Sequence, residues 1–91
     1  MDNYQKESKK TQIRDFSLEY LLIGLANETG ELLGAYKKFI RDSNMDAYNN
    51  MKLECGDVLW YLTRIGEKLD VTLQDIADLN IEKLKKRGGI S

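Results

Sequence analysis

Acidic residues in this sequence recur in pairs three positions apart, a spacing that places both carboxylates on one face of a helix. Four such pairs occur: Glu28/Glu31, Glu54/Asp57, Glu67/Asp70 and Asp75/Asp78. Roughly two pairs are expected by chance at this acidity and length, so the spacing alone does not identify a site. The positions of the pairs relative to the apolar residues decide which of them can do chemistry.

Two of the pairs interrupt a run of apolar residues at helical spacing. Glu28 stands three residues after Leu25, and Glu54 stands three residues after Met51. We therefore expect four carboxylates to point toward the seam between two neighbouring helices: Glu28, Glu31, Glu54 and Asp57. The other two pairs are expected to be solvated, Asp75 and Asp78 on a polar helix face and Glu67 and Asp70 in a turn.

Carboxylates gathered in a helix seam need a counter-charge. Burial of a bare carboxylate is costly, and several of them together repel one another. Oxygen-only ligands favour hard divalent ions, so Mg²⁺ is the natural partner and Mn²⁺ can replace it. Mg²⁺ usually keeps positions for water or phosphate oxygens, which implies a phosphate ester as the ligand. A partly solvated acidic groove without a metal would give the same pattern, and the spacing does not exclude it.

Polar residues near the end of the chain are candidate contacts for such a ligand. Asn80, Lys83 and Arg87 share one face of a predicted helix, where an amide and two cations could bind a nucleotide. The alternative is that the basic residues only stabilise the helix C-terminus. Lys38 and Trp60 are further candidate substrate contacts, with a solvated lysine and a core tryptophan as the alternatives.

Composition narrows the chemistry further. The 91 residues include no histidine and a single cysteine, which exclude a Ser-His-Asp triad, a histidine-ligated metal site and an internal disulfide. Cys55 is expected to be a small buried hydrophobe. The net charge is −1, but residues 16–81 are acidic and the last ten residues are basic. An acidic middle segment repels the phosphates of duplex nucleic acid, so no stable nucleic-acid binding is expected.

Apolar periodicity predicts the helices that must position these residues. A short first helix is expected over about 4–14, and a second begins at Ser17 as N-cap and stops at the turn cluster 41–44. A third is expected over 47–69, and Thr72 caps a fourth that ends before Gly88-Gly89. The residues expected to face inward are Leu18, Leu21, Leu22, Leu25, Leu32, Tyr36, Phe39, Ile40, Met51, Cys55, Val58, Leu62, Ile65, Leu69, Leu73, Ile76, Ala77, Ile81 and Leu84.

The fold predicted from these elements is all-α. It is a small four-helix bundle-like domain over residues 1–91, with two long central antiparallel helices. A core of this size is expected to be completed by homo-oligomerisation. Glycines 24, 30 and 34 lie inside the second helix, so close approach of a neighbouring helix or a ligand is expected there. No stretch is long and apolar enough to span a membrane, and a cytoplasmic location is expected.

Several segments resemble the MazG-like nucleoside triphosphate pyrophosphohydrolases. They are Tyr4-Gln5 with Thr11, Gly24–Glu31, Lys37-Lys38, Glu54–Leu62, and Asn80–Leu84 with Arg87. In that family Glu-x-x-Glu followed by Glu-x-x-Asp binds metal on an all-α bundle that works as a dimer or tetramer. The resemblance implies that Glu28, Glu31, Glu54 and Asp57 are Mg²⁺ ligands and that Asn80, Lys83 and Arg87 contact the nucleotide.

The activity implied by the resemblance is Mg²⁺-dependent hydrolysis of nucleoside or deoxynucleoside triphosphates to the monophosphate and pyrophosphate. Water would attack the α-phosphorus, with Glu28 or Glu31 orienting or deprotonating it. The alternative is a non-catalytic helical module that binds a nucleotide or a partner protein on the same fold.

Overall fold

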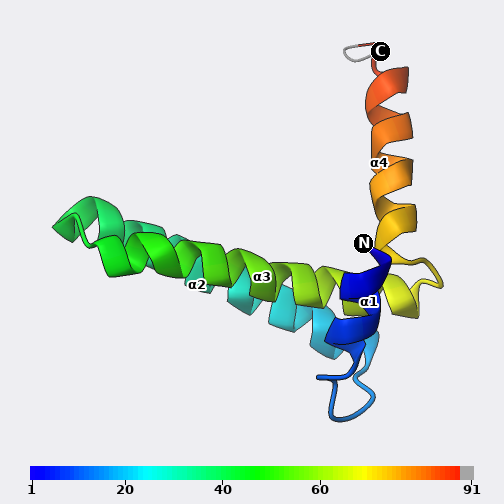
Figure 1. Ribbon diagram of the computed structural model, residues 1–91, viewed down its shortest axis with the longest axis horizontal. Coiled ribbons are helices and arrows are strands. Elements are labelled where there is room, and N and C mark those ends of the chain that lie inside the picture. The colour runs from blue at the N-terminus through cyan, green and yellow to red at the C-terminus, as the bar shows by residue number, and fades with distance from the viewer. Residues whose placement is uncertain (89–91) are drawn as a thin grey trace.

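The computed structural model describes residues 1–88, and all the regular structure in that range is helical (Figure 1). The helices are α1 (Asp2–Lys9), α2 (Leu18–Asp42), α3 (Met45–Lys68) and α4 (Leu73–Lys86). The prediction of an all-α fold with two long and two shorter helices is confirmed. The fourth helix ends before Gly88 as predicted, while Gly89 lies outside the described residues. No helix in the described range is long and apolar enough to cross a membrane.

The two long helices form an antiparallel hairpin whose ends are set by local capping. The Ser17 side chain accepts a hydrogen bond from the Tyr20 N–H at the start of α2, as predicted. Ser43 then adopts a left-handed conformation with φ 51°, and the Asn44 side chain caps α3. Because Asn44 is the cap, α3 begins two residues earlier than predicted. A link of only Ser43 and Asn44 forces α2 and α3 to lie side by side.

The first helix is shorter than predicted, because α1 ends at Lys9 and the chain then forms a loop to Ser17. Ile13, the apolar residue that extended the predicted helix, is 85% exposed. The loop is held to α3 instead, since the Trp60 indole N–H donates to the Thr11 hydroxyl at 2.8 Å. A helix continued to residue 14 would have had no apolar face to bury.

The fourth helix leaves the hairpin at a steep angle (Figure 1). Its start is fixed by a capping box, in which the Thr72 hydroxyl accepts from the Asp75 N–H and the Asp75 carboxylate accepts from the Thr72 N–H. The prediction that Thr72 caps this helix is confirmed. Leu73 in the first turn is buried, but Ile81 is 53% exposed. The expectation that Ile81 faces inward is therefore wrong for the single chain, because within residues 1–88 no other element lies beside the second half of α4 (Figure 1).

The buried core of one chain is small. Its hydrophobic members are Leu21, Ala35, Ala47, Ile65 and Leu73. Several residues predicted to face inward are exposed: Leu22, Tyr36, Ile40, Cys55, Leu62 and Leu69. The radius of gyration is 15.5 Å, against about 12 Å expected for a compact chain of this length. One chain thus leaves much of its predicted core uncovered.

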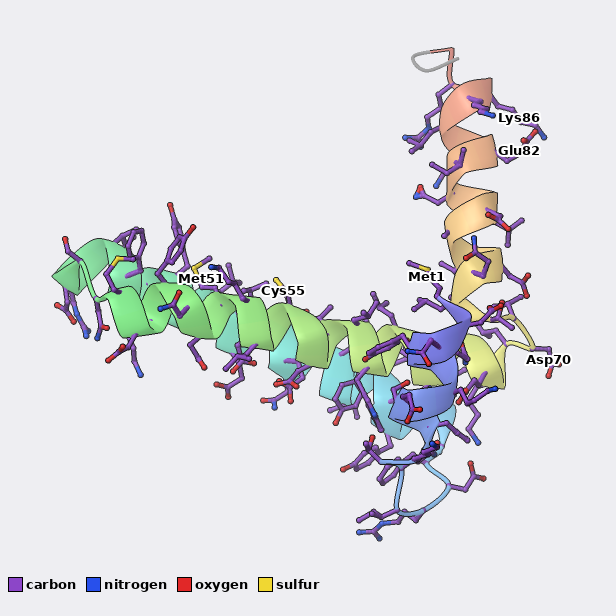
Figure 2. The ribbon with its side chains drawn as sticks, in the orientation of Figure 1. Met1, Met51, Cys55, Asp70, Glu82 and Lys86 are labelled. Carbon is purple, nitrogen blue, oxygen red and sulfur yellow. The ribbon has the colours of Figure 1, made fainter. Side chains whose placement is uncertain are left out.

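The prediction for Cys55 is wrong, and the reason is the rotation of α3 about its own axis. The seam with α2 includes Glu54 and Tyr61, so their neighbours Cys55 and Leu62 lie to one side of it. Figure 2 shows the Cys55 side chain at the edge of α3. Each residue turns a helix by about 100°, so a neighbouring position leaves the seam entirely.

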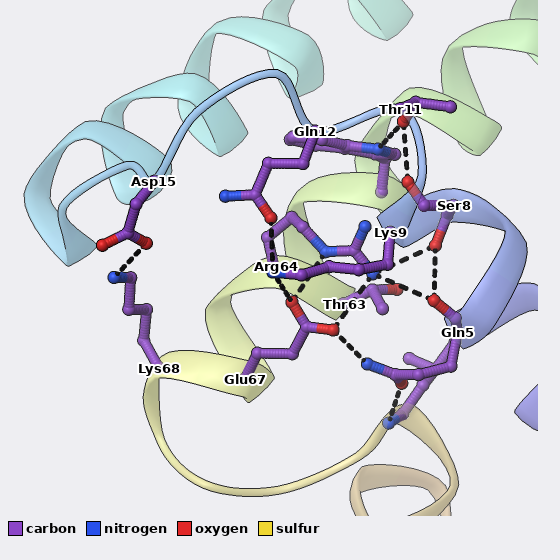
Figure 3. A network of polar contacts seen from close by, with 12 residues as sticks. Gln5, Ser8, Lys9, Thr11, Gln12, Asp15, Thr63, Arg64, Glu67 and Lys68 are labelled. Atoms are coloured by element: carbon purple, nitrogen blue, oxygen red, sulfur yellow. Dashed lines mark hydrogen bonds and ion pairs between the residues drawn. The ribbon is translucent and has the colours of Figure 1, made fainter.

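A polar network joins α1 to the end of α3 and the start of α4 (Figure 3). At its centre, Arg64 is 1% exposed and its Nε lies 3.0 Å from Glu67 Oε1. Arg64 Nη2 also donates to the Ser8 hydroxyl at 3.0 Å. Gln5 donates to Glu67 Oε2 at 2.6 Å and accepts from the Leu73 N–H at 2.8 Å. The interpretation of Glu67 as a solvated turn residue is therefore wrong, since it is the partner of a buried cation.

Candidate metal centre

The helical hairpin brings carboxylates from α2 and α3 to one place. Glu28 and Asp57 lie at similar chain distances from the turn at Ser43, so antiparallel pairing sets them opposite one another. Glu28, Glu54 and Asp57 each offer an oxygen, and these oxygens all lie within 4.8 Å of one another. We call these three residues the acidic cluster. Glu28 and Glu54 are half-buried and Asp57 is exposed, so the cluster opens to solvent on one side.

The electrostatics of the acidic cluster are unfavourable without a cation. Burial raises the pKa of Glu28 above its usual value, and the negative charges of Asp57, Glu54 and Glu31 raise it further. Glu54 Oε2 is buried and accepts no hydrogen bond. A buried carboxylate oxygen without a donor is costly, and a hard cation would supply what it lacks. The donor set is all carboxylate oxygen and so fits Mg²⁺ or Mn²⁺.

Glu31 lies outside the acidic cluster. It lines a neighbouring pocket of about 390 Å³ at the α2–α3 seam, nearer to the hairpin turn. The residues around this pocket are Glu31, Gly34, Ala35, Lys38, Asn44, Asp46, Ala47 and Asn50. We call it the Lys38 pocket, because this predicted substrate contact supplies a cation there. Three of the four carboxylates predicted to converge thus lie together, with Glu31 one helical turn along α2.

Trp60 is half-buried and faces the α1 loop, where its N–H bonds Thr11. The Arg64 guanidinium carbon lies 5.3 Å from the centre of its ring. These contacts give the indole a structural role at the α1–α3 junction.

The predicted nucleotide contacts on α4 are separated from the acidic cluster in one chain. Asn80, Lys83 and Arg87 are all exposed. Glu82 and Lys86 project from the same free part of the helix in Figure 2. Because α4 points away from the hairpin, these residues do not share a cavity with Glu28, Glu54 and Asp57 within a single chain.

Two residues next to the acidic cluster were not singled out from the sequence as site residues. Tyr61 lies one turn after Asp57, and burial raises its pKa, as do the nearby Tyr20, Glu28 and Asp57. Its ring packs against Gly24, one turn before Glu28. The sequence did indicate a close contact at this position, because a glycine inside a helix was expected to mark the approach of a neighbouring helix or a ligand. It could not identify Tyr61 as the contacting residue, because the residue opposite Gly24 depends on the register of α2 against α3.

A helical hairpin that gathers carboxylates from both of its helices defines an all-α protein with a candidate divalent-metal centre. The MazG nucleotide pyrophosphohydrolase domain matches residues 16–89, so the chain belongs to the MazG family. A curated relative, the Gene 37 protein of Mycobacterium phage L5, is 34% identical over 74 residues, or 77% of this chain. The match spans 65% of the length of that relative. No solved structure gives a significant match.

The raised pKa of Glu28 predicts how pH and metal act on stability. The folded state holds the Glu28 proton more tightly than the unfolded state does, so metal-free stability falls as pH rises from 4.5 through the raised pKa. A cation that replaces the proton restores this loss. We expect the rise in Tm on adding about 5 mM MgCl₂ to be larger at about pH 7.5 than at about pH 5.

Differential scanning fluorimetry with and without chelator measures this effect. Glu28→Gln is the matched variant, because it keeps the shape of the side chain and removes the titrating charge. In Glu28→Gln, the rise in Tm on adding MgCl₂ should then depend much less on pH. A rise in Tm that is equal at both pH values, or unchanged in Glu28→Gln, would contradict the prediction.

Proposed function

We propose that this protein hydrolyses nucleoside or deoxynucleoside triphosphates to the monophosphate and pyrophosphate in a divalent-metal-dependent reaction. The observation that carries the proposal is the convergence of three carboxylates from two helices, one of them with a buried oxygen that lacks a hydrogen bond. Membership of the MazG family supports the same activity. Glu28, Glu54 and Asp57 would hold Mg²⁺ or Mn²⁺, with Glu31 as a further ligand.

Bound Mg²⁺ would supply charge neutralisation for the triphosphate and lower the pKa of water. The carboxylate of Glu28 or Glu31 orients the attacking water and accepts its proton. The oxygen of that water forms a bond to the α-phosphorus, while the bond from that phosphorus to the bridging oxygen breaks. Pyrophosphate leaves with the electron pair of the broken bond, and the nucleoside monophosphate remains.

The site we propose is completed by a second copy of the chain, in a dimer or tetramer. Asn80, Lys83 and Arg87 stand free on α4, and exposed apolar side chains line α2 and α3. Association would cover these side chains and bring the α4 residues of one copy to the acidic cluster of another. The whole of residues 1–91 would form one such domain, and its cytoplasmic location stays a prediction.

A substrate panel tests the proposed activity. Purified protein with Mg²⁺ is incubated with each common nucleoside and deoxynucleoside triphosphate, and pyrophosphate and orthophosphate are measured separately. We expect pyrophosphate as the primary product from at least one substrate, and none of it in the presence of chelator. Orthophosphate as the primary product, or no turnover on any substrate, would contradict the proposal.

A further inference from the structure

The direction of α4 is set at its first turn. Within residues 1–88, α4 lies beside α1 and α3 but not beside α2. Beyond the first turn it stands free of the hairpin (Figure 1). A helix rises 1.5 Å per residue, so Arg87 lies about 21 Å along α4 from Leu73, and a tilt of about 10° at the first turn moves Arg87 by about 4 Å. Small changes at the start of α4 therefore become large displacements at its end.

One side chain of α1 bonds both helices that meet at this turn. Gln5 Nε2 donates to Glu67 Oε2 near the end of α3 at 2.6 Å, and Gln5 Oε1 accepts from the Leu73 N–H at 2.8 Å (Figure 3). The Leu73 N–H is one of the N–H groups at a helix start that no carbonyl of the helix can accept. Within residues 1–88, α4 has no other hydrogen bond from another helix. A single amide thus links α4 to both α1 and α3.

The buried ion pair determines which way the Gln5 amide points. The Glu67 carboxylate is held by Arg64, whose Nε lies 3.0 Å from Glu67 Oε1. An ionised carboxylate only accepts hydrogen bonds, so it requires the NH₂ group of Gln5 and not its carbonyl oxygen. The carbonyl oxygen of Gln5 is then free to accept from the Leu73 N–H. A chain of contacts therefore runs from Arg64 through Glu67 and Gln5 to the first turn of α4.

We propose that Gln5 is a positioning residue that sets the direction of α4, and thereby the reach of the nucleotide contacts on that helix toward a second copy of the chain. Those contacts are Asn80, Lys83 and Arg87. The inference rests on the function proposed above and gives a residue of α1 a role in it. Gln5 acts through the Leu73 N–H and touches neither the metal nor the nucleotide.

Comparing nucleotide binding with metal binding tests this role. Gln5→Met keeps the length of the side chain and removes both hydrogen bonds. The probes are Mn²⁺ alone and, with Mg²⁺, the α,β-methylene analogue of each common deoxynucleoside triphosphate. Binding to the full chain is measured by calorimetry at a temperature where circular dichroism shows every variant folded. In Gln5→Met we expect the Kd of the tightest analogue to rise at least about fivefold and the Kd of Mn²⁺ to stay within about twofold.

Hydrogen exchange followed by NMR gives a readout at the bond itself. The Leu73 N–H should exchange faster in Gln5→Met than in the wild-type protein, because its acceptor is gone. Lys9→Met is the matched control, since Lys9 also joins α1 to Glu67, at 3.3 Å, and has no bond to α4 within residues 1–88. It should leave both Kd values within about twofold and the exchange of the Leu73 N–H unchanged.

Gln5→Asn is the second variant, used if Gln5→Met does not fold. It keeps the amide but shortens the side chain by one methylene, so it should retain at most one of the two bonds and also weaken binding of the analogue. An analogue Kd that is the same in the Gln5 variant and in Lys9→Met overturns the positioning role and leaves the proposed function standing. Wild-type protein that binds no analogue overturns both.

Discussion

Replacing Glu54 with glutamine is expected to reduce metal-dependent pyrophosphate release at least about 100-fold. Glu54 belongs to the acidic cluster and carries the buried oxygen that lacks a hydrogen bond. The amide keeps the shape of the side chain but removes the negative charge that a divalent ion requires. The loss should appear in kcat/KM at saturating Mg²⁺, measured as pyrophosphate release on the preferred substrate.

A second readout separates loss of the metal from loss of the fold. Because Glu54 lies among like charges, Glu54→Gln should leave the metal-free Tm at neutral pH equal to the wild-type value or higher. The oligomeric state, measured by light scattering, should not change. Asp78→Asn is the control, since it makes the equivalent change on an exposed face of α4 and should keep activity within about twofold.

The result that contradicts this prediction is an active Glu54→Gln protein. Activity that survives the change would mean that the acidic cluster does not hold the catalytic metal. A wild-type protein with no activity would leave the alternative of a helical module that binds a nucleotide or a partner without hydrolysis.

Replacing Arg64 with alanine is expected to lower the free energy of unfolding by about 3 kcal/mol or more. The Arg64 guanidinium is buried, pairs with Glu67 and donates to Ser8 in α1. Its loss removes the buried partner of Glu67 and the bond to Ser8, and leaves Lys9 and Gln5 as the contacts of Glu67 with α1. Urea unfolding at fixed protein concentration measures the change, because an oligomer's stability depends on concentration.

The fluorescence of the single tryptophan reports on the same region. Trp60 bonds Thr11 in the α1 loop, so detachment of this loop in Arg64→Ala should expose the indole and shift its emission to longer wavelength. Arg41→Ala is the control, because the Arg41–Asp42 ion pair is exposed and worth about 1 kcal/mol or less. Equal loss of stability in the two variants would show that the buried network contributes nothing beyond a surface pair.

Much of the hairpin could be predicted from the sequence because its determinants are local. Each of these signals acts within a few residues of the backbone that it bonds. They are the N-cap Ser17 of α2 and the turn cluster at 41–44, and the N-cap Thr72 fixes the start of α4 in the same way. Glu28 and Glu54 stand in apolar stripes, and Glu28 and Asp57 lie at similar chain distances from the tight turn at Ser43, so the antiparallel hairpin brings these carboxylates near one another. The approximate positions of the two long helices, and the place of Glu28 and Glu54 on their apolar faces, follow from caps and periodicity.

The remaining features of the fold and of the candidate site could be found only from the tertiary structure. Apolar periodicity gives the broad apolar face of a helix but not the line within that face along which a neighbouring helix packs, so it did not separate Glu54 from Cys55 or show that Glu31 lies beside the Lys38 pocket. It also carries no information on pairs far apart in the chain. Arg64 bonding Ser8, Gly24 against Tyr61, and α4 turned away from its own hairpin all depend on helix register and on the path of the chain.

The sequence by itself determined four helices, two of their N-caps, and a set of carboxylates that a helical hairpin must bring near one another. Only the tertiary structure decided which three of them meet, which cation is buried, and where a ligand could lie. The physical reason is that capping and amphipathic spacing act over one or two helical turns. The rotation of each helix and the close approach of side chains are set by packing between residues that are distant in the chain.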